Sequence, residues 1–154
     1  MPMSSDPNPY QLRIIQQDGK ERVFDIIRKK YVVLTPEEWV RQHIIHYLIN
    51  EHKFPKALIS VEKQLLLNGL TKRTDIVLYN RRANPILIVE CKSPDVALNQ
   101  AVVDQAARYN LTLRVPWLWV TNGTKHAICK ITLDTESWQW VDELPGVNDL
   151  LGGE

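Results

Sequence analysis

One short apolar run constrains the fold of this chain more than any other part of its sequence. Residues 85–91 read PILIVEC, so Glu90 directly follows five apolar residues. An uninterrupted apolar run is typical of a strand that is covered on both faces, because a strand with one exposed face alternates polar and apolar residues. A sheet with two covered faces needs other elements on each side. The run therefore predicts a central sheet in a mixed α/β domain.

Turn and capping residues predict the elements around this strand. Two β-rich runs within residues 11–27 meet at an Asp-Gly dipeptide, which tolerates the positive φ of a tight turn, so we expect an N-terminal β-hairpin. A helix is expected to begin at Pro36, with Thr35 as its N-cap and Glu38 placed to close a capping box. A second helix is expected over residues 95–113, and further strands at residues 31–34, 58–67, 74–79, 117–121 and 126–132.

Length and charge limit the classes of protein that the chain can represent. It has 154 residues and no Pro/Gly/Ser linker, which favours one domain over residues 10–150. Residues 1–9, with three prolines and two serines, and residues 151–154 are expected to be mobile tails. The formal net charge is +1, so any surface that binds nucleic acid must carry a local excess of positive charge.

Compartment and cysteine usage indicate an ordinary cytoplasmic protein. The sequence contains no membrane-spanning apolar run and no secretory signal, so we expect a cytoplasmic location and no membrane partner. Cys91 and Cys129 lie in separate apolar runs without a C-x-x-C motif, and both are expected to be reduced core residues.

Charged residues stand where two of the expected strands begin and end. Asp75 lies near the start of one strand, and Glu90 and Lys92 lie two residues apart at the end of the next, so their side chains share a face. Asp75, Glu90 and the backbone carbonyl of Cys91 are oxygen ligands of the kind that Mg²⁺ takes. A metal there would polarise a phosphodiester, while Lys92 orients the attacking water or stabilises developing charge. The alternative is a turn cap at Asp75 and a solvated cross-strand pair of Glu90 with Lys92.

Polar residues of the second helix form another candidate group. Gln105 and Tyr109 are four positions apart and lie on one helical face with Ala101, where an amide and a phenol can hydrogen-bond a phosphate, a base or a carboxylate. The pair alone favours a simpler interpretation, a polar helix edge with an anchoring tyrosine.

The histidines, tryptophans and basic clusters have less specific patterns. His43 and His46 lie three apart on the first helix, but surface or partly buried roles are favoured over metal binding. The tryptophans at positions 117, 119, 138 and 140 alternate in strand fashion, which core packing or a subunit interface explains more simply than base stacking. Basic clusters at 28–30, 72–73 and 81–82 are usually solvated faces, but the last two flank the Asp75 strand, which favours phosphate contacts.

In combination, these residues resemble a known family. The spacing of Asp75, Glu90-Cys91-Lys92 and Gln105-Ala-Ala-Arg-Tyr109 is similar to that of the PD-(D/E)XK nuclease core with the Gln-x-x-x-Tyr motif of its helicase-associated branch. The stretches TPEEWVRQ, KRTDIVLY, ILIVECKSP, QAARYN and VTNG resemble recurring blocks of the N-terminal nuclease domain of the R subunit of type I restriction enzymes, over residues 23–131. Thr74 replaces the usual proline before the aspartate.

The resemblance implies a restriction-endonuclease-like fold and hydrolysis of DNA with Mg²⁺, for which Mn²⁺ can substitute. Asp75 and Glu90 would then bind the metal with the Cys91 carbonyl, and Lys92 would support the attacking water. Gln105 and Tyr109 would position DNA or the catalytic lysine.

The family also carries an acid on the first helix. Glu38 matches the better position as a metal ligand and catalytic residue, although it is also the expected capping-box residue, and Glu37 is the weaker candidate. Glu62 matches another frequent acid of the family.

The differences from the R subunit concern its motor. The chain has no G-x-x-x-x-G-K-[ST] loop and therefore no ATP site, so a separate motor, methylase or specificity protein is expected as a partner alongside DNA. A homodimer would supply two active sites for double-strand cleavage. The second hypothesis is a catalytically silent module of a restriction or defence system that binds nucleic acid or serves in assembly.

Overall fold

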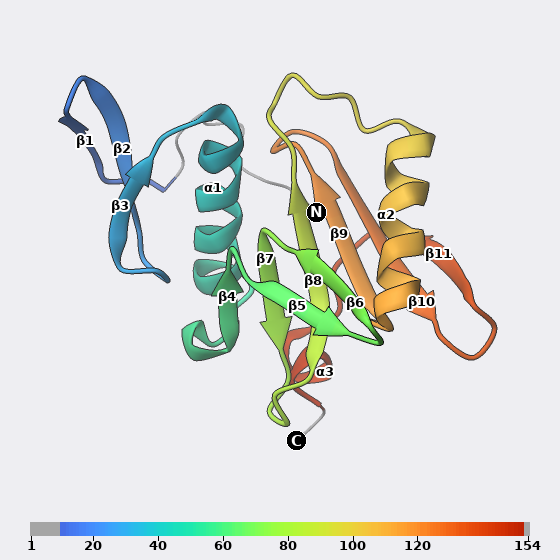
Figure 1. Ribbon diagram of the computed structural model, residues 1–154. Coiled ribbons are helices and arrows are strands. Elements are labelled where there is room, and N and C mark those ends of the chain that lie inside the picture. The colour runs from blue at the N-terminus through green and yellow to red at the C-terminus, as the bar shows by residue number, and fades with distance from the viewer. Residues whose placement is uncertain (1–9, 153–154) are drawn as a thin grey trace.

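The central sheet of the protein is mixed and six-stranded. The computed structural model describes residues 10–152, so the tail expected at residues 1–9 and the last two residues of the tail expected at 151–154 lie outside it. Within the described residues, the strand order of this sheet is β11-β10-β9-β8-β7-β4 (Figure 1). The strands are Ser137–Val141 (β11), His126–Thr132 (β10), Trp117–Thr121 (β9), Pro85–Cys91 (β8), Ile76–Tyr79 (β7) and Ile59–Val61 (β4). Strands β8 and β9 are parallel, and the other neighbours are antiparallel.

Helices and a hairpin cover the two faces of this sheet. Helix α1 (Pro36–Asn50) and the short α3 (Val147–Leu151) pack into one core. The other face is covered by α2 (Gln100–Leu113) and by the hairpin of β5 (Gln64–Leu67) and β6 (Leu70–Arg73). A single 3-10 turn, Lys56–Leu58, precedes β4. A separate sheet of β1 (Ile14–Gln17), β2 (Lys20–Asp25) and β3 (Lys30–Val33) lies beside α1 (Figure 1). The expected α/β class and flanking helices are confirmed.

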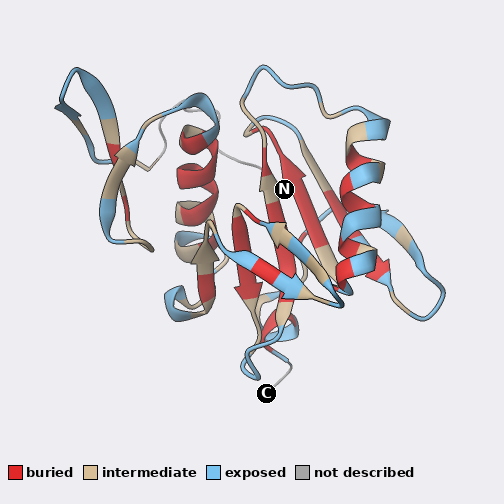
Figure 2. Ribbon diagram, in the orientation of Figure 1, coloured by how far each residue is buried: buried red, intermediate tan, exposed pale blue. Residues whose placement is uncertain are grey.

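Strand β8 is the central strand that the apolar run predicts. Residues 86–89 are buried, as Figure 2 shows for the middle of the sheet. Strands β7 and β9 pair with its two edges. Leu87 and Val89 pack in the core with α1, whereas Ile88 packs in the core with Leu65 of β5 and Leu113 of α2. Alternate side chains of one strand therefore join two cores on opposite faces.

Two predicted local signals are confirmed at the N-terminal end. The turn between β1 and β2 is formed by Asp18 and Gly19, with φ values of 53° and 75°. Helix α1 begins at Pro36 with Thr35 as its N-cap, and the Thr35 hydroxyl accepts a hydrogen bond of 3.0 Å from the Glu38 backbone N–H.

The prediction of one strand over residues 58–67 is wrong. The run divides at Glu62, which has a φ of 57°, so that β4 joins the central sheet and β5 leaves it. Strand β5 turns at Asn68-Gly69 and pairs with β6 as an additional hairpin. Glu62, Lys63 and Gln64 interrupt the apolar residues at the break, but a short polar stretch does not by itself show that the chain leaves the sheet. The Asn-Gly dipeptide was the available signal.

Other boundaries differ less from the predictions. Helix α2 begins at Gln100 rather than at residue 95, because Asn99 caps it by accepting a hydrogen bond from Val102 N–H at 2.9 Å. Strand β11 and helix α3 were not predicted as separate elements. Helix α3 includes Leu151, whose side chain is buried, so the packed region extends past the expected boundary at residue 150.

The two cysteines are buried core residues, as the sequence analysis expects. Cys91 and Cys129 are both buried and carry free thiols, and burial raises the pKa of Cys129 to about 12. No helix among residues 10–152 has the length and hydropathy that crossing a membrane requires.

Candidate active site

Asp75 lies one residue before β7 and bonds to two different elements. Its Oδ2 accepts a hydrogen bond of 2.8 Å from the backbone N–H of Cys91 in β8, and its Oδ1 accepts one of 2.7 Å from Arg41 of α1. Ile76 is paired with Val89 in the antiparallel ladder of β7 and β8. Extending that register by one residue sets Asp75 opposite Glu90. The two predicted metal-binding acids therefore stand at the same end of adjacent strands.

Glu90 is held between two lysines. Its Oε2 lies 3.2 Å from the Lys92 ammonium, and its Oε1 lies 3.8 Å from the ammonium of Lys72 in β6. The carboxylate is 21% exposed and the two lysines about a third exposed, so the group remains open to a ligand. Lys72 was noted in the sequence only as part of a basic cluster. Its position at the site was missed because the sequence analysis did not predict the hairpin that carries Lys72 over the sheet.

Residues of α2 complete a cavity over Glu90. The cavity has a volume of about 230 Å³ and is lined by Glu90 and Lys92 from the end of β8, by Gln105 and Tyr109 from α2, and by Lys72. The Lys72 ammonium lies 4.7 Å from the centroid of the Tyr109 ring, which is the geometry of a cation–π contact. Four of the residues proposed from sequence thus line one concave space. Asp75 and Glu38 are not part of this lining.

Arg41 is a component of the site that the sequence motifs did not identify. Its side chain is 5% exposed, and its guanidinium lies 2.7 Å from Glu38, 2.7 Å from Asp75 and 3.0 Å from Glu62. Burial lowers the pKa of Arg41, but the hydrogen bond to Asp75 and the charge of Glu38 outweigh burial and raise it. The guanidinium therefore stays charged and joins α1 to the start of β7. The three-residue spacing from Glu38 to Arg41 was the available signal.

Glu38 and Glu37 have different surroundings. The Glu38 carboxylate is 8% exposed and accepts hydrogen bonds from Arg28 at 3.1 Å, Arg41 at 2.7 Å and Gln42 at 2.9 Å. Its backbone N–H donates to the Thr35 hydroxyl, but its carboxylate binds these side chains instead of closing the expected capping box. Glu37 is 50% exposed and lies 3.7 Å from Arg41. Burial and then the charge of Asp75 raise the Glu37 pKa. Glu37 is the helix acid that is open to a ligand.

Glu62 lies between two arginines. Its Oε1 contacts Arg41 at 3.0 Å, and its Oε2 accepts a hydrogen bond of 2.8 Å from Arg73. The hydrogen bond from Arg73 lowers the pKa of Glu62. Its position at the break between β4 and β5 explains why the carboxylate reaches the same guanidinium as Asp75.

The oxygen atoms at this site fit a hard cation in chemical type. The carboxylates of Asp75 and Glu90 and the Cys91 carbonyl are oxygen ligands, and Mg²⁺ completes such sets with water. Among residues 10–152, however, no three side chains of His, Cys, Asp or Glu converge closely enough to hold a metal. This excludes His43 and His46 from such a cluster. A metal at Asp75 and Glu90 would therefore depend on water and backbone oxygen for its remaining ligands.

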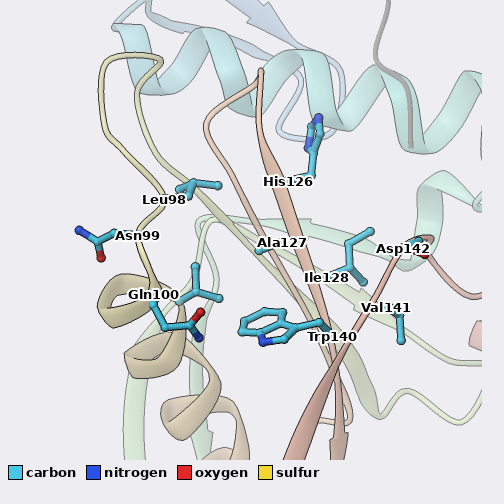
Figure 3. Close-up of a pocket in the computed structure, with 10 residues that line it drawn as sticks. Leu98, Asn99, Gln100, His126, Ala127, Ile128, Trp140, Val141 and Asp142 are labelled. Carbon is cyan, nitrogen blue, oxygen red and sulfur yellow. The ribbon is translucent and has the colours of Figure 1, made fainter.

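A second cavity lies beside the start of α2, at the same end of the sheet as Glu90, because the register of β8, β9 and β10 places His126 level with Thr121 and Cys91. It has a volume of about 330 Å³ and is lined by residues of the α2 N-terminus, β10 and β11, including His126 and Trp140 (Figure 3). The His126 Nδ1 accepts a hydrogen bond of 3.2 Å from the Trp119 indole, and burial lowers the pKa of His126 to about 4. Trp119 is buried as core packing predicts, whereas Trp140 is 43% exposed.

Comparisons with known proteins point to one family. The sequence profile described as type I restriction enzyme R protein N terminus (HSDR_N) matches residues 36–145, which is more than half of the chain. A solved fragment described as the HsdR subunit of a type I restriction enzyme from Vibrio vulnificus YJ016 shares 30% identity. That match covers 53% of this chain and 15% of that one, with a TM-score of 0.37. The search of curated proteins gave no match.

Proposed function

This chain belongs to the type I restriction enzyme R protein N-terminal family, and we propose that it is a Mg²⁺-dependent endonuclease domain that hydrolyses DNA phosphodiester bonds. The observation that carries the proposal is the cavity in which Glu90 and Lys92 meet Gln105 and Tyr109, beside Asp75. A carboxylate, an amine and neutral hydrogen-bond donors around one space are the groups that phosphodiester hydrolysis requires.

Each residue has a defined part in this proposal. Asp75, Glu90 and the Cys91 carbonyl would hold Mg²⁺ or Mn²⁺, which supplies an activated water and stabilises charge on the phosphate. Lys92 lies 3.2 Å from Glu90, so its ammonium can orient a water that approaches the acid, or neutralise charge that develops on the phosphate. Gln105 and Tyr109 lie on the α2 wall and can hydrogen-bond the phosphate oxygens.

The helix acid in this proposal is Glu37 as well as Glu38. Glu38 has three protein donors within 3.1 Å, so a metal would have to compete with Arg28, Arg41 and Gln42 for its oxygens. Glu37 has one long contact and a raised pKa, which makes it the acid more available to a water or a cation near Asp75. Glu38 therefore acts on the site through Arg41, which it positions.

The partners follow from the family and from the charge. DNA is the proposed substrate, and motor, methylase or specificity proteins are the proposed partners, because the family is that of a restriction enzyme subunit. The net charge of +1 predicts weak unaided binding to DNA, so a partner would bring the substrate. Two copies would be needed to cut both strands at one place.

Cleavage of plasmid DNA tests the proposal. The purified chain should nick supercoiled plasmid in the presence of Mg²⁺ or Mn²⁺, and should not do so in EDTA. Asp75→Asn and Lys92→Ala should abolish nicking, whereas Lys125→Ala, which removes an exposed charge from the β9–β10 turn, should not. Equal nicking by the wild type, Asp75→Asn and Lys92→Ala would refute the proposal.

A second candidate function is favoured by the contacts of Asp75. Both of its oxygens already have protein donors, at 2.8 Å and 2.7 Å, so the structure needs no cation to satisfy them. A silent module that binds nucleic acid or serves in assembly would retain such a site for stability. Calorimetry distinguishes the two functions, because the silent module would bind no divalent metal. Its DNA binding would be salt-sensitive and unaffected by Lys92→Ala.

A further inference from the structure

We propose that Lys72, on the inner face of the β5–β6 hairpin, binds a DNA phosphate in the cavity between β6 and α2. This inference rests on the proposed function, because it names the substrate group that the same cavity receives. Lys72 lines the cavity together with Lys92, Gln105 and Tyr109. The hairpin would then act as one wall of a phosphodiester site in addition to covering the sheet.

The hairpin that carries Lys72 is held firmly against the domain. Its turn residue Asn68 donates a hydrogen bond of 3.2 Å to the backbone carbonyl of Leu113, at the end of α2. Leu65 of β5 is buried against Val77 and Ile88 of the central sheet. The hairpin lies across the sheet beside β8 in Figure 1. The position of Lys72 over Glu90 is therefore set by packing on both sides of the turn.

Alternation along β6 separates Lys72 from its neighbour Arg73. The burial pattern of β6 alternates, with Lys72 partly buried and Arg73 exposed. Arg73 is 72% exposed and hydrogen-bonds Glu62, whereas Lys72 is 30% exposed and faces Glu90 and Tyr109. Adjacent strand residues point to opposite faces, so only one of the two charges reaches the cavity.

The charges around the cavity favour an anion. Two ammonium groups, those of Lys72 and Lys92, face one carboxylate, that of Glu90. Glu90 lies 3.2 Å from Lys92 but 3.8 Å from Lys72, which is beyond hydrogen-bonding distance. The Lys72 ammonium lies over the Tyr109 ring and retains donors for a ligand. A phosphodiester, with one negative charge and two free oxygens, matches this surplus of one positive charge.

Measurement of DNA binding in EDTA tests the role of Lys72 without cleavage. The wild type, Lys72→Met and Lys63→Met would be titrated against a fluorescent duplex by anisotropy, from about 50 to about 200 mM KCl. Methionine keeps most of the aliphatic stem that lies against the Tyr109 ring. Lys63 is the matched control, because it is exposed, belongs to the same hairpin region and does not line the cavity. Circular dichroism melts would verify that each variant is folded, and Lys72→Arg would test whether a positive charge suffices.

Loss of one phosphate contact has a defined signature. The slope of log Kd against log salt should fall by about 0.9 for Lys72→Met. If the variant and the wild type bind equally at 1 M salt, this slope change makes the variant bind about eightfold more weakly than the wild type at 0.1 M salt. Lys72→Arg should restore most of this loss, and Lys63→Met should keep the wild-type slope. An unchanged slope for Lys72→Met, an equal effect of Lys63→Met, or no wild-type binding would overturn the inference. Metal-dependent nicking is measured in a separate assay. If the nicking assay fails, the binding assay in EDTA still shows whether Lys72 binds a DNA phosphate.

Discussion

Removal of Arg41 is the perturbation that most directly tests how the site is held together. The Arg41 guanidinium is the shared partner of Glu38, Glu62 and Asp75, with contacts of 2.7 to 3.0 Å, and its side chain is 5% exposed. Arg41→Met retains much of the volume and removes the charge. The variant would leave the buried Glu38 and the partly buried Asp75 and Glu62 without their common cation, which is costly wherever water cannot take its place.

The expected loss follows from the contacts that remain. Breaking a buried ion pair by removing one partner costs about 3–5 kcal/mol. Glu38 keeps Arg28 and Gln42, and Asp75 keeps the Cys91 N–H, so the low end of that range applies. We expect the free energy of unfolding to fall by about 3 kcal/mol, which corresponds to a decrease in Tm of about 6–12 °C for a chain of this size.

Urea unfolding and thermal melts would measure this loss. Arg73→Met is the control, because Arg73 also pairs with Glu62 but is 72% exposed. An exposed pair contributes little, so the control should change stability by no more than about 0.5 kcal/mol. A loss below about 1 kcal/mol at neutral pH, or an equal loss for Arg73→Met, would refute the reasoning.

Two further predictions concern the helix acids and His126. Glu38→Gln should destabilise the fold by about 2 kcal/mol, because the partly buried Arg28 and the buried Arg41 lose the carboxylate that they pair with. Glu37→Gln should change stability by no more than about 0.5 kcal/mol in urea unfolding. Similar losses for both would contradict the assignment of Glu38 to structure. Burial lowers the pKa of His126 to about 4, so the unfolded chain binds a proton first and stability is lost as the pH falls from about 6.5 towards 4. His126→Gln should remove about 1 kcal/mol of this loss at pH 5, after allowance for the partly exposed ring, and an unchanged pH profile would contradict the prediction.

The central part of the fold follows directly from local sequence. The apolar residues 86–89 have no polar position to expose, so β8 had to lie between two covered faces, and the structure buries all four. The cap at Thr35 and the turn at Asp18-Gly19 depend on neighbouring residues alone, and both occur where predicted. The Asn68-Gly69 dipeptide marks the turn of the β5–β6 hairpin, but the departure of β5 from the central sheet at Glu62 depends on where the hairpin packs.

The candidate site also has features that local sequence predicts and features that only packing decides. Glu90 and Lys92 share a face because strand residues two apart always do, and Gln105 and Tyr109 share a face because helix residues four apart do. These two pairs could therefore be predicted from spacing. That both pairs line one cavity was decided by the packing of α2 on the sheet.

Long-range contacts determined the remaining features. Sequence alone could not choose between Glu37 and Glu38, because both precede the same apolar stripe. The fold directs Glu38 into Arg28 and Arg41 and leaves Glu37 half exposed. Arg41 became part of the site only when β4 and β7 brought Glu62 and Asp75 to it. Periodicity and turn chemistry act within a few residues and therefore determine the elements, whereas the environment of a charge depends on residues distant in sequence, and only the tertiary structure decides it.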